Sequence, residues 1–222
     1  MKKKLSKEEQ DIINATATAF NLANLTRPKV VIALPTTGTV LALTTQSIGG
    51  SIIGANEAGL QVIDFIVRKS CEIASSRTWL VQEAIKAGAT HLLFVDSDMV
   101  FPYDTIAKLL AHKKDIVGVH YNKRQFPLEL VSKPLEKESD TELYQAQHAG
   151  TGLMLIGLKI FKKDWINPQT RNKTPWFSFG RDSQGALALG EDAWFCYSAR
   201  DNGFETWIDP TIKVGHLGDY LY

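Results

Sequence analysis

The pattern of apolar and polar residues changes close to residue 29. Before that point apolar positions recur at helical spacing, and Ser6 and Glu9 have the spacing of a capping box. Pro28 ends this predicted helix. We therefore divide the chain into an N-terminal helical segment, residues 1–28, and a domain, residues 29–222. We interpret the helix as packing against the domain, with binding to a partner as the alternative.

Short apolar runs alternate with segments of helical spacing through much of the domain. The expected strands cover residues 30–34, 61–67, 91–95, 115–121 and 152–156, and the expected helices cover residues 71–87 and 104–112. Continuous apolar runs of five residues are typical of strands buried on both faces of a parallel sheet. Residues 123–144 and 167–189 are irregular and are predicted as loops, with a short hairpin as the alternative for the first. The alternation predicts an α/β fold with a mostly parallel central sheet and flanking helices.

The composition is that of an ordinary globular protein. Of the 222 residues, 44% are hydrophobic and 22% charged, and the formal net charge of +1 gives no overall attraction to nucleic acid or anionic lipid. No apolar run approaches the roughly 18 residues that a membrane span needs. Charged residues follow Lys2–Lys4 where a signal peptide would be apolar. Cys71 and Cys196 have neither CxxC nor metal-ligand spacing, so we expect two buried thiols in a cytoplasmic protein.

Two aspartates follow the predicted strand at residues 91–95. Ligands of open α/β sheets bind beyond the carboxyl ends of the strands, which is where Asp96 and Asp98 would lie. Carboxylates separated by one residue can act together on Mg²⁺ or Mn²⁺, which prefer oxygen ligands. The alternative is that both side chains only cap the next turn.

Two further polar motifs lie near the C-terminus. Glu191 and Asp192 follow a glycine and begin a predicted helix, so one of them could serve as a general base. Acidic residues are also favoured at helix N-termini by the helix dipole alone. His216 lies between Gly215 and a Leu-Gly pair; it is either a ligand or a structural histidine.

Taken in order, several short motifs resemble bacterial and phage glycosyltransferases of the GT-A fold, related to the large inverting family two. The resemblance covers residues 29–218. Its markers are Pro35-Thr-Thr-Gly38, Ser76-Arg77, Phe94-Val-Asp-Ser-Asp98, Val117-Gly-Val-His-Tyr-Asn-Lys-Arg124, Gly150-Thr-Gly-Leu-Met154, Pro175-Trp-Phe177, Gly190-Glu-Asp192 and Gly215-His-Leu217. The resemblance implies a nucleotide-diphospho-sugar transferase fold and transfer of a sugar, with inversion, from a nucleotide sugar, with UDP as the favoured nucleotide.

The resemblance also implies a divalent metal site, occupied by Mn²⁺ or Mg²⁺. Asp98 would be its principal carboxylate and His216 a further ligand. Asp96 would lie at the metal or in its surroundings, close to the ribose. Trp176 would stack on a sugar face, although a loop residue anchored in the core is the alternative.

Donor and acceptor contacts follow from the same resemblance. Thr36 would hold the nucleotide, Asp64 its base or ribose, and Arg77 the nucleotide or the Asp-Ser-Asp turn. Asp192 would be the general base and Glu191 would organise the acceptor or its loop, although the sequence does not distinguish which of the two is the base. The acceptor, a glycan, lipid, protein or modified nucleic acid, and the oligomeric state are left open.

Two rival functions are compatible with parts of this pattern. Nucleotidyl transfer onto a sugar phosphate also uses metal-bound carboxylates, but it favours a basic glycine-rich loop after the first strand, and Pro35–Gly38 contains no Lys or Arg. A non-catalytic nucleotide-sugar-binding module would keep the fold without turnover. The presence of both Asp98 and Asp192 favours an enzyme over such a module.

Overall fold

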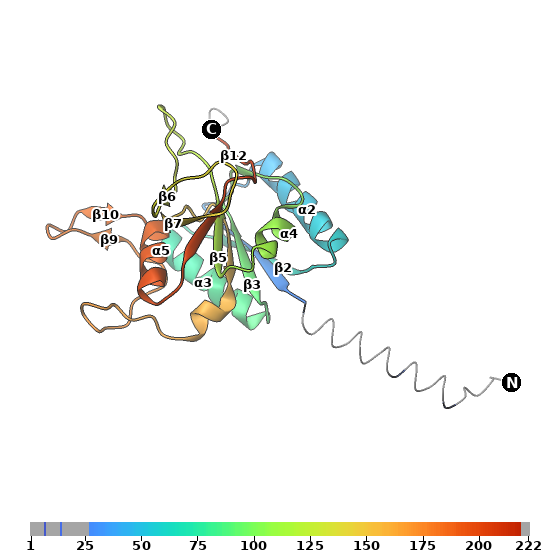
Figure 1. Cartoon of the computed structure of the whole chain (residues 1–222), viewed down its shortest axis with the longest axis horizontal. Coiled ribbons are helices and arrows are strands. Elements are labelled where there is room, and N and C mark those ends of the chain that lie inside the picture. The colour runs from blue at the N-terminus through green and yellow to red at the C-terminus, as the bar shows by residue number, and fades with distance from the viewer. Residues whose placement is uncertain (1–6, 8–13, 15–26, 219–222) are drawn as a thin grey trace.

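An eight-stranded mixed sheet forms the centre of the protein (Figure 1). The structure, a computed structural model, describes residues 7, 14 and 27–218, so the helix predicted within residues 1–28 lies largely outside the described residues. The strands lie in the order β2 (Gln61–Lys69), β1 (Lys29–Thr36), β3 (His91–Val95), β8 (Leu153–Gly157), β5 (Ile116–Val119), β11 (Thr206–Asp209), β7 (Tyr144–His148) and β6 (Lys133–Pro134). Only β8 and β7 run against the other six, so the sheet is mostly parallel in strand direction.

Helices cover both faces of this sheet. Within residues 27–218 the α-helices are α2 (Ala42–Glu57), α3 (Ile73–Lys86), α4 (Thr105–Ala111) and α5 (Glu191–Asp201). Helices α2 and α4 lie on one side of the sheet and α3 and α5 on the other (Figure 1). Side chains of α2 and α4 share one apolar cluster with alternate residues of β1, and side chains of α3 and α5 share the other cluster. The predicted α/β fold with a mostly parallel sheet is therefore confirmed. No helix in the described part of the chain has both the length and the apolarity to span a membrane.

Short elements complete the edges. They are β4 (Met99–Val100), β12 (Gly215–His216), β9 (Gly180–Arg181), β10 (Leu187–Leu189) and a 3₁₀ helix over Leu158–Lys162. The β9–β10 pair forms a hairpin inside residues 167–189, which we expected to be irregular. Strand β6 lies inside the predicted loop at residues 123–144 and pairs with β7, which begins at the last residue of that loop. The prediction that both cysteines are buried is wrong for Cys71, which is exposed, whereas Cys196 is buried.

Helix α2 has no counterpart among the predicted elements. It contains two adjacent glycines and several Ser and Thr residues, and its buried side is made largely of small side chains. At Gly54 a Cβ atom would lie only 2.8 Å from Cδ2 of Tyr103 and closer still to the Tyr103 carbonyl. The helix therefore docks through close approach of its backbone rather than through a wide apolar stripe.

This contact gives a stability prediction. Gly54→Ala should destabilise the protein by about 1–3 kcal/mol because the new methyl group overpacks a rigid backbone contact. Gly49→Ala is the matched control in the same helix, where a Cβ would have no atom within 4 Å. It should stabilise the protein by roughly 0.5–1 kcal/mol through helix propensity. Urea unfolding midpoints measure both changes, and equal effects of the two substitutions would contradict the packing of α2.

Candidate active site

Six of the predicted polar residues line one cavity at the carboxyl ends of β1 and β3, whereas Asp64 and Asp192 do not line it. These strands are parallel neighbours, so the turns that follow them open at the same edge of the sheet. The backbone N–H of Leu41 donates to the Ser97 carbonyl at 2.9 Å and ties the two turns together. The cavity has a volume of about 430 Å³. Its lining comprises Pro35, Thr36, Thr37, Ser70, Cys71, Ile73, Arg77, Asp96, Ser97, Asp98, Arg124, Glu191 and His216.

The segment that carries His216 is fixed beside Asp98 by a small ladder. Strand β12 pairs antiparallel with β4, which sets His216 opposite Met99, and the Leu217 N–H donates to the Asp98 carbonyl at 2.8 Å. Nε2 of His216 then lies 3.5 Å from Oδ1 of Asp98. Both side chains are largely buried, being 13% and 14% exposed. Residues more than a hundred positions apart are thus held face to face.

The hydrogen bonds of His216 define which ring nitrogen faces the carboxylate. Nδ1 lies 2.8 Å from the Asn122 carbonyl, so Nδ1 must carry a proton and donate it. In the neutral ring Nε2 therefore directs a lone pair toward Asp98 Oδ1, which is buried and has no hydrogen-bond partner in the described structure. Two facing lone pairs repel unless a proton or a cation lies between them. Although burial acts to lower the pKa of His216, the adjacent Asp98 carboxylate and the Asn122 carbonyl raise it overall.

This pair fits a divalent cation as well as a proton. Metal-binding histidines commonly donate from the other ring nitrogen to a carbonyl, as His216 does from Nδ1, which leaves Nε2 free to bind the metal. The unpartnered Asp98 oxygen would be the second ligand. Among residues 27–218 no group of three or more His, Cys, Asp or Glu side chains is arranged to hold a metal. The protein would therefore supply two ligands, which leaves positions for water and substrate phosphate oxygens, as is common for Mg²⁺ and Mn²⁺.

Arg124 adds a cationic group to the same carboxylate. It extends from the loop after β5, is 52% exposed, and donates from Nη1 to Oδ2 of Asp98 at 2.9 Å. The contact is replaceable because water competes for the exposed guanidinium, although Asp98 itself is largely buried. Arg124 is thus placed to exchange Asp98 for a phosphate group that enters the cavity.

Arg77 forms the buried centre of a second network. It lies one turn into α3, is only 3% exposed, and donates to Asp96 at 2.9 Å and to Glu191 at 3.3 Å. Its remaining Nη1 is buried without a hydrogen-bond partner in the described structure. Arg77 therefore joins the turn after β3 to the start of α5, and its Nη1 group remains free to donate.

Asp192 lies next to this network, at the N-terminus of α5. Its Oδ1 accepts from the Ala193 N–H at 2.8 Å. Burial raises the pKa of Asp192, although the Ala193 N–H and Arg77 act to lower it. Burial also raises the pKa of Glu191, against the opposing charge of Arg77. A carboxylate with a raised pKa is better suited to accept a proton than an ordinary surface aspartate.

Three of the predicted residues have other surroundings. The Thr36 hydroxyl lines the cavity but donates to the Thr39 carbonyl at 2.8 Å and so shapes its own turn. Asp64 pairs with Val31 and therefore lies five residues before the carboxyl end of β2, where Lys69 pairs with Thr36. Asp64 does not line the cavity. Trp176 packs on Phe161, with ring centroids 4.8 Å apart, at the edge of an apolar cluster. The geometry of Trp176 favours the core-anchored alternative over sugar stacking.

The structure also identifies residues to which the sequence assigned no role. Tyr121 accepts from the Gly152 N–H through its hydroxyl at 2.9 Å and packs edge-on against His216 at 5.3 Å. Asn122 orients His216 through its carbonyl, and Arg124 binds Asp98. All three lie in the marker motif at residues 117–124. The position of this motif among the other markers was the only sequence signal that could have indicated a role for them.

Comparison with known proteins defines the fold. No family model matches the chain, and no curated protein sequence matches it. Among solved structures the chain is similar to A197 from STIV, at 16% identity and a TM-score of 0.57, with 86% of each chain covered. It is also similar to GalNAc-T7, crystallised with UDP, GalNAc and Mn²⁺, at 12% identity and a TM-score of 0.54. That match covers 87% of this chain and 44% of GalNAc-T7. The chain therefore has the GT-A fold, as predicted.

Proposed function

We propose that this protein is a glycosyltransferase that moves a sugar from a UDP-sugar to an acceptor hydroxyl with a divalent metal, Mn²⁺ or Mg²⁺, bound at Asp98. The observation that carries the proposal is the Asp98–His216 pair, whose facing lone pairs need a proton or a metal cation between them, in a cavity that Arg77, Arg124 and two further carboxylates also line. The presence of UDP and Mn²⁺ in the GalNAc-T7 structure supports this choice of nucleotide and metal.

The proposed donor site uses the residues at the carboxyl ends of β1 and β3. Asp98 and His216 would hold the metal, and when bound it would offset the negative charge that grows on the departing diphosphate. Arg124 would leave Asp98 and contact a diphosphate oxygen. Thr36 would position the turn against the nucleotide, and Asp96, fixed by Arg77, would face the ribose.

The proposed reaction is a single displacement. The acceptor oxygen forms a bond to the anomeric carbon while the bond from that carbon to the diphosphate oxygen breaks, and the nucleoside diphosphate leaves. Asp192 takes the hydroxyl proton of the acceptor, a role for which its raised pKa is suited. Attack opposite the leaving group inverts the configuration. Glu191 acts through Arg77, because their contact fixes the start of α5 and thus Asp192.

A screen of nucleotide sugars tests this function. UDP-, GDP- and TDP-sugars are incubated with the protein and Mn²⁺, and release of nucleoside diphosphate is measured. Slow hydrolysis of one donor, abolished by a chelator, is the expected result. Release of pyrophosphate from a nucleoside triphosphate and a sugar phosphate would instead indicate nucleotidyl transfer. Metal-independent binding without hydrolysis of any donor would indicate a non-catalytic binding module.

A ligand substitution tests the second metal contact. His216→Ala should weaken Mn²⁺ binding at least about tenfold, because a ligand or its ordered surroundings is lost. His91→Ala is the matched control, since His91 lies half-buried at the opposite end of β3 and contacts Thr90. Mn²⁺ affinity is measured by electron paramagnetic resonance titration. Equal affinity in the wild-type protein and His216→Ala would exclude His216 from the metal site.

A further inference from the structure

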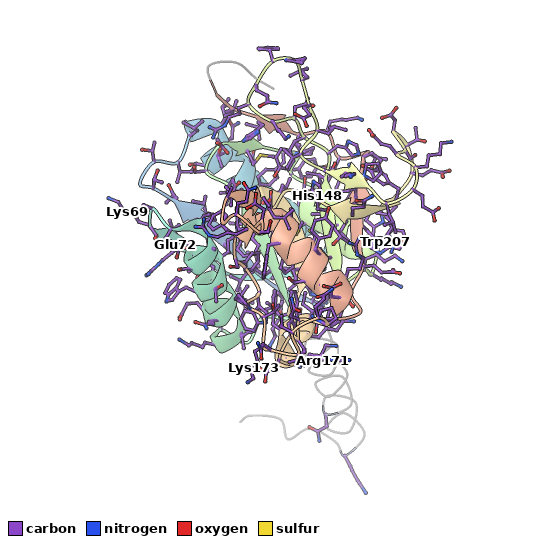
Figure 2. All side chains as sticks on the ribbon, turned by 90° about the vertical axis from the view of Figure 1, so that its left-hand side faces the viewer. Lys69, Glu72, His148, Arg171, Lys173 and Trp207 are labelled. Atoms are coloured by element: carbon purple, nitrogen blue, oxygen red, sulfur yellow. The ribbon has the colours of Figure 1, made fainter. Side chains whose placement is uncertain are left out.

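Strand β2 forms one edge of the central sheet and is its longest strand, with nine residues. Its inner side pairs with β1 from Gln61 to Lys69. In the described part of the chain no strand pairs with its outer side, so a row of backbone N–H and C=O groups faces outward there. Figure 2 shows Lys69, at the end of this strand, at the outer margin of the molecule. Such an edge can accept a further strand.

The side chains of β2 are unusual for a free edge. Ile63, Phe65 and Val67 are 39%, 41% and 46% exposed. The sheet register sets Phe65 beside Ile32 and Val67 beside Leu34, and both of these β1 residues are fully buried under α2. The apolar surface therefore continues outward from the core and is left partly uncovered at the edge. Monomeric proteins usually protect such edges with charges, proline or a covering loop; here the exposed apolar side chains alternate with charged ones at Asp64 and Arg68.

The charges on β2 have a self-complementary arrangement. Asp64 and Arg68 lie four residues apart on the same face as Ile66, which points toward α3. If two copies of β2 pair antiparallel about a two-fold axis at Ile66, each Asp64 lies opposite Arg68 of the other copy. The same register sets each Phe65 opposite Val67 and Ile66 opposite itself. Opposite charges and apolar pairs facing each other across strands stabilise antiparallel pairing.

Neighbouring registers lack this match. An axis at Phe65 sets Asp64 opposite Ile66, and an axis at Val67 sets Arg68 opposite Ile66, so both leave charges facing an apolar side chain. The β-bulge that shifts the register between Val30 and Val31 leaves Ile63 without a partner in β1. Regular strand geometry therefore begins at Asp64. The Ile66-centred register pairs residues 64 to 68, and all of them lie in this regular part of the strand.

We propose that the outer edge of β2 binds β2 of a second copy of this chain, antiparallel and centred on Ile66, to form a homodimer with one continuous sheet. The interface is isologous, because the same strand contributes from both subunits. Backbone hydrogen bonds supply affinity, and the Asp64–Arg68 pairs select the register. The proposal is independent of the enzymatic function proposed above.

Charge exchange tests the pairing. Sedimentation velocity from about 5 to 200 µM should show a mass that rises from 24.7 kDa toward twice that value. Asp64→Arg or Arg68→Asp should each weaken dimerisation at least tenfold, because like charges then face each other, and the double variant should restore it. Glu136→Arg, an exposed change near the far edge of the sheet, is the charge control and should leave the dimer intact. Circular dichroism melting verifies that each variant is folded.

Cysteine cross-linking tests the register. In a Cys71→Ser background, Ile66→Cys should form an intermolecular disulfide on mild oxidation with diamide, since directly opposed residues of antiparallel strands have Cα atoms about 4.5–5.5 Å apart. Phe65→Cys in the same background should cross-link much less. A monomer at all concentrations, or a dimer that neither Asp64→Arg nor Arg68→Asp weakens, would overturn the proposal. Preferential cross-linking through residue 65 would overturn the Ile66-centred register.

Discussion

Asp192→Asn is expected to lower turnover by about 10²–10⁴-fold, the usual contribution of a positioned general base. The amide keeps the shape of the side chain and can still accept from the Ala193 N–H. The Asp98–His216 pair and the Arg77 network are unchanged, so the protein should still bind the donor in its ground state. Donor affinity should therefore remain within about twofold of the wild-type value. The two quantities are measured as kcat for nucleoside diphosphate release and as the dissociation constant of the donor by calorimetry.

Glu191→Gln is the matched comparison for this prediction. Glu191 is bound to Arg77, so its loss should disturb the start of α5 and lower turnover less than the loss of Asp192. A wild-type turnover in Asp192→Asn together with collapse in Glu191→Gln would reverse the assignment of the base.

The pH dependence of turnover provides an independent test of Asp192. The base is active only when deprotonated, so kcat/KM should fall as pH falls through the pKa of Asp192, which burial raises above that of an ordinary aspartate. The same shift has a consequence for stability. Because the folded state disfavours the charged form, ionisation of Asp192 destabilises the fold as pH rises through its range. Asp192→Asn should therefore raise the melting temperature at neutral pH and not at acidic pH.

Arg77→Ala is expected to have the largest effect on stability. Its loss leaves Asp96 and Glu191 without their buried partner, which typically costs about 3–5 kcal/mol. For a chain of 222 residues this corresponds to a fall in melting temperature on the order of 10 °C. Differential scanning calorimetry measures the change.

Two variants separate charge from geometry in the Arg77 network. Arg77→Lys keeps the charge but cannot reach both carboxylates with a planar fork, so it should recover only part of the stability. Arg200→Ala removes an exposed arginine at the end of α5 and should change the melting temperature by no more than about 1–2 °C. A wild-type melting temperature in Arg77→Ala would show that the buried network does not stabilise the fold.

The elements that the sequence predicts best are those whose residues are buried on all sides. Strand β3 has the expected bounds, His91–Val95, because it lies between β1 and β8 and is apolar and buried from Leu92 to Val95. Helix α2 could not be predicted in the same way. Its docking depends on the absence of a side chain at Gly54, opposite Tyr103, and such a contact leaves no apolar periodicity in the sequence.

The candidate site was predictable where it depends on strand ends and motif order. Asp96, Asp98, Glu191 and His216 line one cavity, and Arg77 joins two of them, whereas Asp192 lies beside it at the start of α5. Contacts set by loops and register were not predictable. The bulge in β2 and the position of Asp64 along the strand separate it from the cavity, which no local pattern reveals.

The direction of side chains in irregular segments could not be predicted from the sequence either. Trp176 lies in a loop whose polar and aromatic residues are compatible with either a sugar platform or a core anchor, and only packing against Phe161 distinguishes them. The contact of Arg124 with Asp98 likewise depends on the path of the loop after β5.

Calorimetric titration with UDP, in the presence and absence of Mn²⁺, tests the metal-dependent donor site most directly. In the wild-type protein Mn²⁺ should increase UDP affinity at least about tenfold, because the ion joins Asp98 to the diphosphate. Asp98→Asn should abolish this increase, whereas Asp104→Asn, which alters a carboxylate paired with Lys108 outside the cavity, should retain it. A UDP affinity that does not depend on Mn²⁺ in the wild-type protein, or a full metal effect in Asp98→Asn, would contradict the proposed site.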